Sequence, residues 1–186
     1  MHKILRQIVK AGLRTETAPL PDAALRQGAD RLGEELLQLL GRALAIRHVD
    51  AGSCNGCELE IHALNNPYYN LEGQGIRFVA SPRHADLLLV TGPVARNMAL
   101  ALRRTYEAMP APKLVVAVGD CGCSGGIFGT GYASCGAVAN VIPVDLVVPG
   151  CPPAPLELLR GILLAAGRLP RVGAVRAEAP VAAEGR

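Results

Sequence analysis

Cysteines at three separate places are the residues of this 186-residue chain best suited to chemistry. Cys54 and Cys57 form a C-x-x-C pair inside a run of small residues at 52–58, GSCNGCE. Cys121 stands in a glycine-rich turn and Cys151 in a turn with two prolines, and each turn follows an apolar, β-branched run. Because thiolates are soft metal ligands, four of them arriving from three loops indicate a metal site.

The donor set leaves more than one chemistry open. A C-x-x-C pair with two distant cysteines suits tetrahedral zinc or an iron-sulfur cluster. We favour a four-iron cluster because structural zinc usually takes two C-x-x-C pairs, and because glycine turns let backbone N–H groups approach a bulky anionic cluster. A redox-active dithiol is a third interpretation, but it leaves Cys121 and Cys151 without a role. A phosphate or flavin cradle at Gly125 to Gly131 is a fourth, disfavoured because cysteines occupy the loop after the first strand.

The elements that position these cysteines follow the pattern of βαβ units from Ile46 onwards. Short apolar runs predict strands over Ile46 to Asp50, Ile76 to Ala80, Ala85 to Thr91, Lys113 to Val118 and Asp145 to Val148. Helices are expected over Cys57 to Asn65, Arg96 to Met109, Ser134 to Val141 and Pro155 to Gly167. The pattern predicts a flavodoxin-like α/β fold, a doubly wound parallel sheet with order 2-1-3-4-5. Such sheets bind ligands at the carboxyl ends of their strands, where all four cysteines are expected.

The remaining segments divide the chain into three parts. Residues 1–45 predict a helical N-terminal extension, 46–167 the flavodoxin-like domain, and 168–186 a flexible tail. Within the extension, Met1 to Arg14 predict a short basic amphipathic helix, and Ala23 to Leu44 a second helix. The basic helix suits an anionic membrane surface, a membrane subunit, or ordinary packing as a terminal helix.

Composition excludes several classes of protein. A net charge of +3 with 3% aromatic residues disfavours nucleic-acid binding. Six cysteines without a recognisable leader indicate a reducing compartment rather than a disulfide framework. No apolar stretch approaches the roughly 18 residues needed to span a bilayer. We therefore expect a cytoplasmic protein that is soluble or peripheral on a membrane.

Three motifs together resemble the small-subunit family shared by nickel-iron hydrogenases and complex I. They are residues 54–58 (CNGCE), residues 119–121 (GDC) with 124–128 (SGGIF), and residues 148–155 (VPGCPPAP). The resemblance runs from Ile46 to Gly167. It implies a domain holding one [4Fe-4S] cluster next to a large catalytic subunit, with Cys54, Cys57, Cys121 and Cys151 as the ligands.

Finer features of the motifs resemble one branch of that family. The complex I members of the family have two adjacent cysteines at the first motif, whereas the spacing of Cys54 and Cys57 is that of hydrogenases. Residues 50–58 and 81–86 most resemble the membrane-bound group 4 enzymes, such as the small subunits of formate hydrogenlyase and hydrogenase 4. This implies an oxidoreductase subunit that passes electrons between a hydrogenase large subunit and a ferredoxin-like iron-sulfur subunit. Membrane-arm subunits would hold the complex on the inner face of the cytoplasmic membrane.

Two alternatives to this function stay open at the level of sequence. One is a complex I-like electron-transfer subunit of a nickel-free, hydrogenase-related or quinone-reducing complex. The other is a structural zinc module of an assembly.

Other polar and cysteine residues near the motifs carry weaker expectations. Glu60 matches the position of a complex I carboxylate beside the terminal cluster, so the resemblance implies a proton-transfer role. Glu58 is expected to favour the N-terminal dipole of its helix, and Asp120 to cap a turn. Cys123 and Cys135 are expected to pack as small apolar side chains. Cys123 has a second interpretation, as an alternative ligand or a redox-tuning thiol if it faces the cluster.

Overall fold

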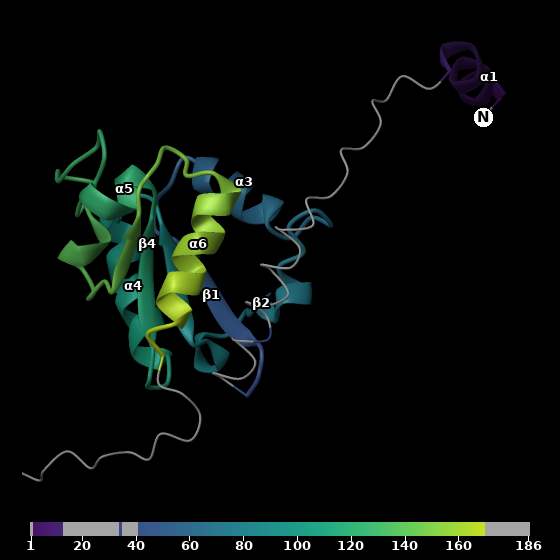
Figure 1. The fold of residues 1–186 in the computed structure, drawn as a ribbon. Helices are drawn as coiled ribbons and strands as arrows, with labels where there is room; N and C mark the ends of the chain where they lie inside the picture. The colour runs from purple at the N-terminus through teal and green to yellow at the C-terminus, as the bar shows by residue number, and fades with distance from the viewer. Residues whose placement is uncertain (1, 13–33, 35–40, 170–186) are drawn as a thin grey trace, which may run out of the picture.

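The computed structural model describes residues 2–12, 34 and 41–169, and its main body is a parallel β-sheet with helices on both faces (Figure 1). The strands are β1 (Leu44–Asp50), β2 (Ile76–Phe78), β3 (Leu87–Thr91), β4 (Leu114–Val118) and β5 (Leu146–Val148). All four strand pairings are parallel, and the order is β2-β1-β3-β4-β5. The flavodoxin-like order predicted from the sequence is confirmed.

The faces of the sheet are covered by α3 (Gly56–Ala63), α4 (Arg96–Ala108), α5 (Gly119–Ser124) and α6 (Pro155–Ala166). A further helix, α1 (His2–Ala11), precedes β1 in the chain and has no buried residue. Short 3-10 turns lie at Glu72–Gln74, Pro82–His84 and Val138–Asn140. In the described part of the chain, no helix combines the length and the apolar character that crossing a bilayer requires.

The predicted helix over Ser134 to Val141 is wrong. Ser134 and Cys135 instead form antiparallel bridges, and only Val138–Asn140 adopts a helical turn. Gly136, with a φ of +78°, interrupts any helix that would begin before it. At α5 the sequence predicts a tight turn, and this prediction is also wrong, because the segment forms a six-residue helix.

The packed domain extends slightly beyond the predicted limits of residues 46–167. β1 begins at Leu44, and Leu169 is buried in the core. The helix predicted over Ala23 to Leu44 lies almost wholly outside the described residues. The same holds for the predicted tail beyond Leu169.

Side chains alternate along the central strands β1, β3 and β4 between two apolar cores, because successive residues of a strand point to opposite faces. One core lies under α3 and α6, and the other lies under α4. The first includes Leu44, Ile46, Leu87, Leu89, Val116 and Val118. The second includes Val49, Leu88, Val90, Val115, Ala117 and Leu102. Burial on both faces explains why the strands read as nearly continuous apolar runs.

Candidate metal centre

Four cysteines from three loops line one cavity at the carboxyl edge of the sheet. The cavity, about 160 Å³ in volume, is lined by Cys54, Cys57, Cys121 and Cys151 together with small residues. These cysteines follow β1, β4 and β5, the loops that the predicted topology brings to one edge. Cys54 and Cys151 are exposed, whereas Cys57 and Cys121 are half-buried, and all four are free thiols. The site therefore opens toward solvent on one side.

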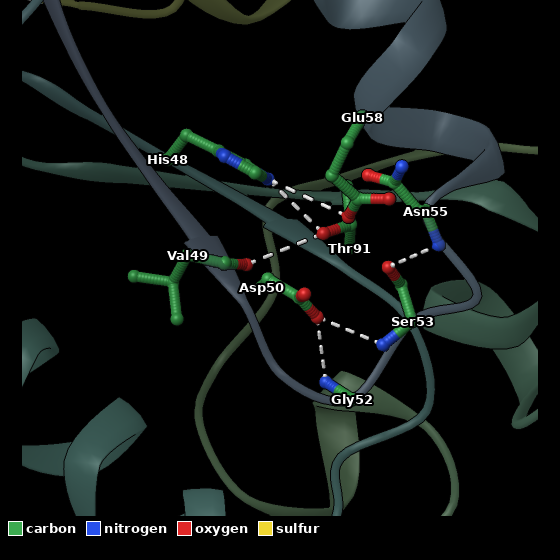
Figure 2. Close-up of polar contacts among 8 residues, drawn as sticks. All are labelled: His48, Val49, Asp50, Gly52, Ser53, Asn55, Glu58 and Thr91. Carbon is green, nitrogen blue, oxygen red and sulfur yellow. Dashed lines mark hydrogen bonds and ion pairs between the residues drawn. The ribbon is translucent and has the colours of Figure 1, made fainter.

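The first loop is shaped by hydrogen bonds from its own backbone to two short side chains. Asp50 Oδ1 accepts hydrogen bonds from the backbone N–H groups of Gly52 and Ser53, both at 2.8 Å (Figure 2). Ser53 Oγ accepts a third, from the N–H of Asn55 at 3.1 Å. Asn55 adopts a left-handed φ of 72°, which asparagine tolerates better than most residues. These bonds hold Cys54 ahead of α3, whose first turn carries Cys57.

The second and third loops are tied to each other through Asp120. Its carboxylate Oδ1 accepts a hydrogen bond from the N–H of Gly150 at 2.8 Å, and its own N–H donates to the Gly150 carbonyl at 2.9 Å. The expectation that Asp120 caps its own turn is therefore wrong, because its side chain binds a loop 30 residues further along the chain. This link fixes the position of Cys121 relative to Cys151.

Two glycines pack directly against cysteine sulfurs. A Cβ atom added at Gly119 would lie 2.7 Å from Cys57 Sγ, and one added at Gly126 would lie 2.9 Å from Cys121 Sγ. Both glycines have positive φ, +78° and +54°, which other residues adopt at a cost. Glycine at these positions keeps the cradle around the sulfurs open.

Two of the cavity thiols, Cys57 and Cys121, have raised pKa values. Burial raises the pKa of Cys57 to about 12, with smaller contributions from the charge of Glu58 and from the other three cysteines. Burial also raises the pKa of Cys121, and the neighbouring Cys151 adds to this. A reactive dithiol needs a lowered thiol pKa, so the raised pKa of Cys57 disfavours Cys57 as the nucleophile of such a pair. These shifts also show that the four cysteines are close enough to influence one another.

A buried polar cluster lies beneath the first turn of α3, and sequence reasoning missed it (Figure 2). Glu58 is only 6% exposed, and neither carboxylate oxygen has a hydrogen-bond partner among the described residues. His48 Nε2 lies 3.8 Å from Glu58 Oε1 and 3.0 Å from Thr91 Oγ1. Burial lowers the pKa of His48, although the charge of Glu58 opposes this.

Strand alternation was the available signal for this cluster. His48 continues the face of Leu44 and Ile46, and Thr91 continues that of Leu89, so both had to point toward α3. Glu58 was expected only to favour the helix dipole, a role that does not require burial.

The other residues considered in the sequence analysis, Glu60, Cys123 and Cys135, do not line the cavity. Glu60 is half-buried on α3. The thiol of Cys123 donates to the Ala117 carbonyl at 3.7 Å, and Cys135 packs against the core under α4. Both cysteines thus pack as half-buried side chains, close to the expected role.

The chain matches known proteins over most of this domain. The sequence model of the family described as "NADH ubiquinone oxidoreductase, 20 Kd subunit" matches residues 54–165, which include all four cavity cysteines. The chain is 42% identical over 146 residues to the probable membrane-bound hydrogenase subunit mbhJ of Pyrococcus furiosus, covering 78% of this chain and 86% of that protein.

Two further relatives are named as subunits of different complexes. Formate hydrogenlyase subunit 7 of Escherichia coli is 45% identical over 72% of this chain, which spans about half (52%) of that protein. An NADH-quinone oxidoreductase subunit of Desulfovibrio desulfuricans is 45% identical, over 66% of each chain.

A solved structure supports the fold and the relationship. A chain of the membrane-bound sulfane sulfur reductase, an archaeal respiratory membrane complex, superposes with a TM-score of 0.59 at 35% identity. The match covers 68% of this chain and 70% of that chain.

Fold and site together define an α/β protein with a four-cysteine centre at the carboxyl edge of its sheet. The chain belongs to the family of the 20 kDa subunit of NADH ubiquinone oxidoreductase. Its relatives are oxidoreductase subunits of hydrogenase and NADH-quinone oxidoreductase complexes, as the motifs predicted.

Proposed function

We propose that the chain is the electron-transfer small subunit of a membrane-associated group 4 nickel-iron hydrogenase of the formate hydrogenlyase type. Cys54, Cys57, Cys121 and Cys151 would hold one [4Fe-4S] cluster next to the catalytic large subunit. The proposal rests on one observation. These four cysteines, and no other cysteine of the described residues, line one cavity. Bound there, the cluster would supply one-electron transfer, and the chain itself would break no substrate bond.

The residues present fit a cluster better than a single zinc ion. Thiolates suit both, but the cysteines surround a cavity of about 160 Å³. Within the described residues, no group of three or more His, Cys, Asp or Glu side chains is arranged to hold one metal ion. Gly119 and Gly126 pack against two of the sulfurs, and a side chain at either position would displace the sulfur beside it.

The exposed side of the cavity supports the proposal that this face of the chain lies against a large subunit. Cys54 and Cys151 are exposed, and the loop after Cys121 carries Ile127 and Tyr132 at 94% and 97% exposure. Exposed apolar side chains beside a site are typical of surfaces that a partner covers. Covering this face would exclude water from the cluster, while other faces of the complex would carry the ferredoxin-like and membrane-arm subunits.

A complex I-like role in a nickel-free complex is the second candidate. The relationship to NADH-quinone oxidoreductase subunits and to the sulfane sulfur reductase chain favours it. The spacing of Cys54 and Cys57 favours the hydrogenase, because the complex I members of the family have adjacent cysteines at this motif.

The test is hydrogen-dependent viologen reduction, without oxygen, by the complex that co-purifies with a tagged form of the full chain. We expect activity, and we expect Cys54→Ser and Cys151→Ser to abolish it while lowering iron and acid-labile sulfide. Cys135→Ser is the matched control and should keep both. Zinc at stoichiometry without sulfide would overturn the cluster. Iron and sulfide without hydrogen oxidation would favour the nickel-free candidate.

Glu60 is proposed to transfer protons between the cluster region and the large subunit. It lies one helical turn beyond Cys57 on α3 and is half-buried, so a partner could complete its surroundings. Glu60→Gln should slow proton-coupled turnover about 100-fold or more without changing the iron content, because about 100-fold is the lower end of what one positioned acid-base group contributes. Unchanged turnover in this variant would remove the role.

A further inference from the structure

The first described helix, α1, separates its side chains into two continuous faces. At 3.6 residues per turn, the large apolar residues Ile4, Leu5, Ile8 and Val9 fall within about 140° of arc. The polar residues His2, Lys3, Arg6, Gln7 and Lys10 fall within another arc of about 140°. No acidic residue occurs in the helix. The two faces thus differ in both polarity and charge.

The apolar face of α1 is exposed. Ile4, Leu5, Ile8 and Val9 are between 57% and 82% exposed, and no residue of the helix is buried. A helix of ten residues is marginal in water by itself, and most helices gain stability by covering an apolar face. Something outside the described residues must therefore cover this face if the helix is to persist.

We propose that α1 lies in the headgroup region of an anionic lipid bilayer. Amphipathic helices of this kind insert their apolar face at the boundary between headgroups and acyl chains, while Lys and Arg pair with lipid phosphates. Lys3, Arg6 and Lys10 provide that charge complementarity. An apolar groove on a protein partner would match the apolar face but gives no reason for a polar face that is cationic and free of acids.

Vesicle binding by the full-length chain tests this proposal. The chain is mixed with vesicles of phosphatidylcholine alone, or of phosphatidylcholine with phosphatidylglycerol, and the sedimented fraction is measured. We expect binding only to vesicles that contain phosphatidylglycerol, and weaker binding as salt is added. Replacing Lys3, Arg6 and Lys10 with Gln should weaken binding about 100-fold, since each basic residue contributes about fivefold.

Two further variants separate membrane binding from general effects. Ile4→Ser with Ile8→Ser should also abolish binding, because it removes half of the large apolar residues. Arg83→Gln with Arg103→Gln and Arg104→Gln removes three exposed cations from the domain and should bind as the unchanged chain does. Far-UV circular dichroism checks that every variant keeps the fold of the domain.

Three results would overturn the proposal. The first is equal binding to both kinds of vesicle, and the second is an equal loss in the domain control. The third is no vesicle binding together with failure of the α1 variants to assemble with other subunits, which would identify a protein as the occupant. None of these readouts depends on iron or on hydrogen oxidation. Failure of the membrane-binding proposal would therefore leave the proposed electron-transfer function unaffected.

Discussion

Glycines decide the geometry around the cysteine sulfurs at the scale of single residues. Gly119 begins α5 with a φ of +78°, and its missing side chain leaves Cys57 Sγ in place. Gly129, in the following loop, also has a positive φ of +53°, but a Cβ there would meet nothing within 4 Å. The two positions therefore share a positive φ, and a Cβ would meet a cysteine sulfur only at Gly119.

This pair yields a direct prediction. Gly119→Ala and Gly129→Ala should both lose about 1–2 kcal/mol of stability from the left-handed backbone. Only Gly119→Ala should also lose the proposed cluster, because its Cβ would displace the sulfur of Cys57. Iron and acid-labile sulfide per chain measure the difference, and equal cluster content in both variants would contradict it.

Individual elements combine to form the polar cluster under α3. His48 comes from the end of β1, Thr91 from the end of β3 and Glu58 from the first turn of α3. Burial lowers the pKa of His48, so the folded chain accepts a proton at this imidazole less readily than the unfolded chain. The stability from this group is complete above the unfolded pKa and is lost as the pH falls below it.

The pH dependence of unfolding tests that interpretation. As pH falls below about 6.5, the pKa of free histidine, the chain should lose stability by at most about 1.4 kcal/mol per pH unit from this one group. His48→Gln should flatten the dependence, measured by urea unfolding at several pH values. His62→Gln changes an exposed histidine of α3 and controls for the loss of an imidazole. An unaltered slope in His48→Gln would refute the assignment.

Helix α6 shows how one element carries both core and surface. Ile162 is fully buried in the core under α3 and α6, whereas Leu164 on the same helix is 66% exposed. Ile162→Ala should cost about 2–5 kcal/mol through lost burial and a residual cavity. Leu164→Ala should stay within about 0.5 kcal/mol. The urea concentrations at which the two variants are half unfolded measure this difference in stability.

At the scale of the whole molecule, the cavity has exposed groups around it. Cys54 and Cys151 are exposed, and the exposed Ile127 directly follows Gly126, which packs against Cys121 Sγ. The relatives are subunits of multi-subunit complexes, which agrees with an incomplete surface on the isolated chain.

A charge placed on the loop after Cys121 should separate assembly from cluster binding. Ile127→Asp should weaken association with the large subunit about tenfold or more, because burying an unpaired polar group costs about 1–3 kcal/mol or more. Iron content should not change. Leu100→Asp, at an exposed position on α4, is the control and should still assemble. A pull-down with the tagged chain measures how much large subunit is recovered, and equal recovery with both variants would place the interface elsewhere.

The sequence by itself determined the strand order and the three strand ends after which the cysteines follow. Apolar runs mark each strand, and right-handed crossovers leave few orders for five parallel strands. The tertiary structure decided features that depend on residues far apart in the chain. The six residues of α5 are too short to show a helical period, and bridges to Ala95 and Thr130 overrode the helix expected at Ser134. The cluster of His48, Thr91 and Glu58 and the link from Asp120 to Gly150 exist only because separate elements pack together, so no local pattern encodes either contact.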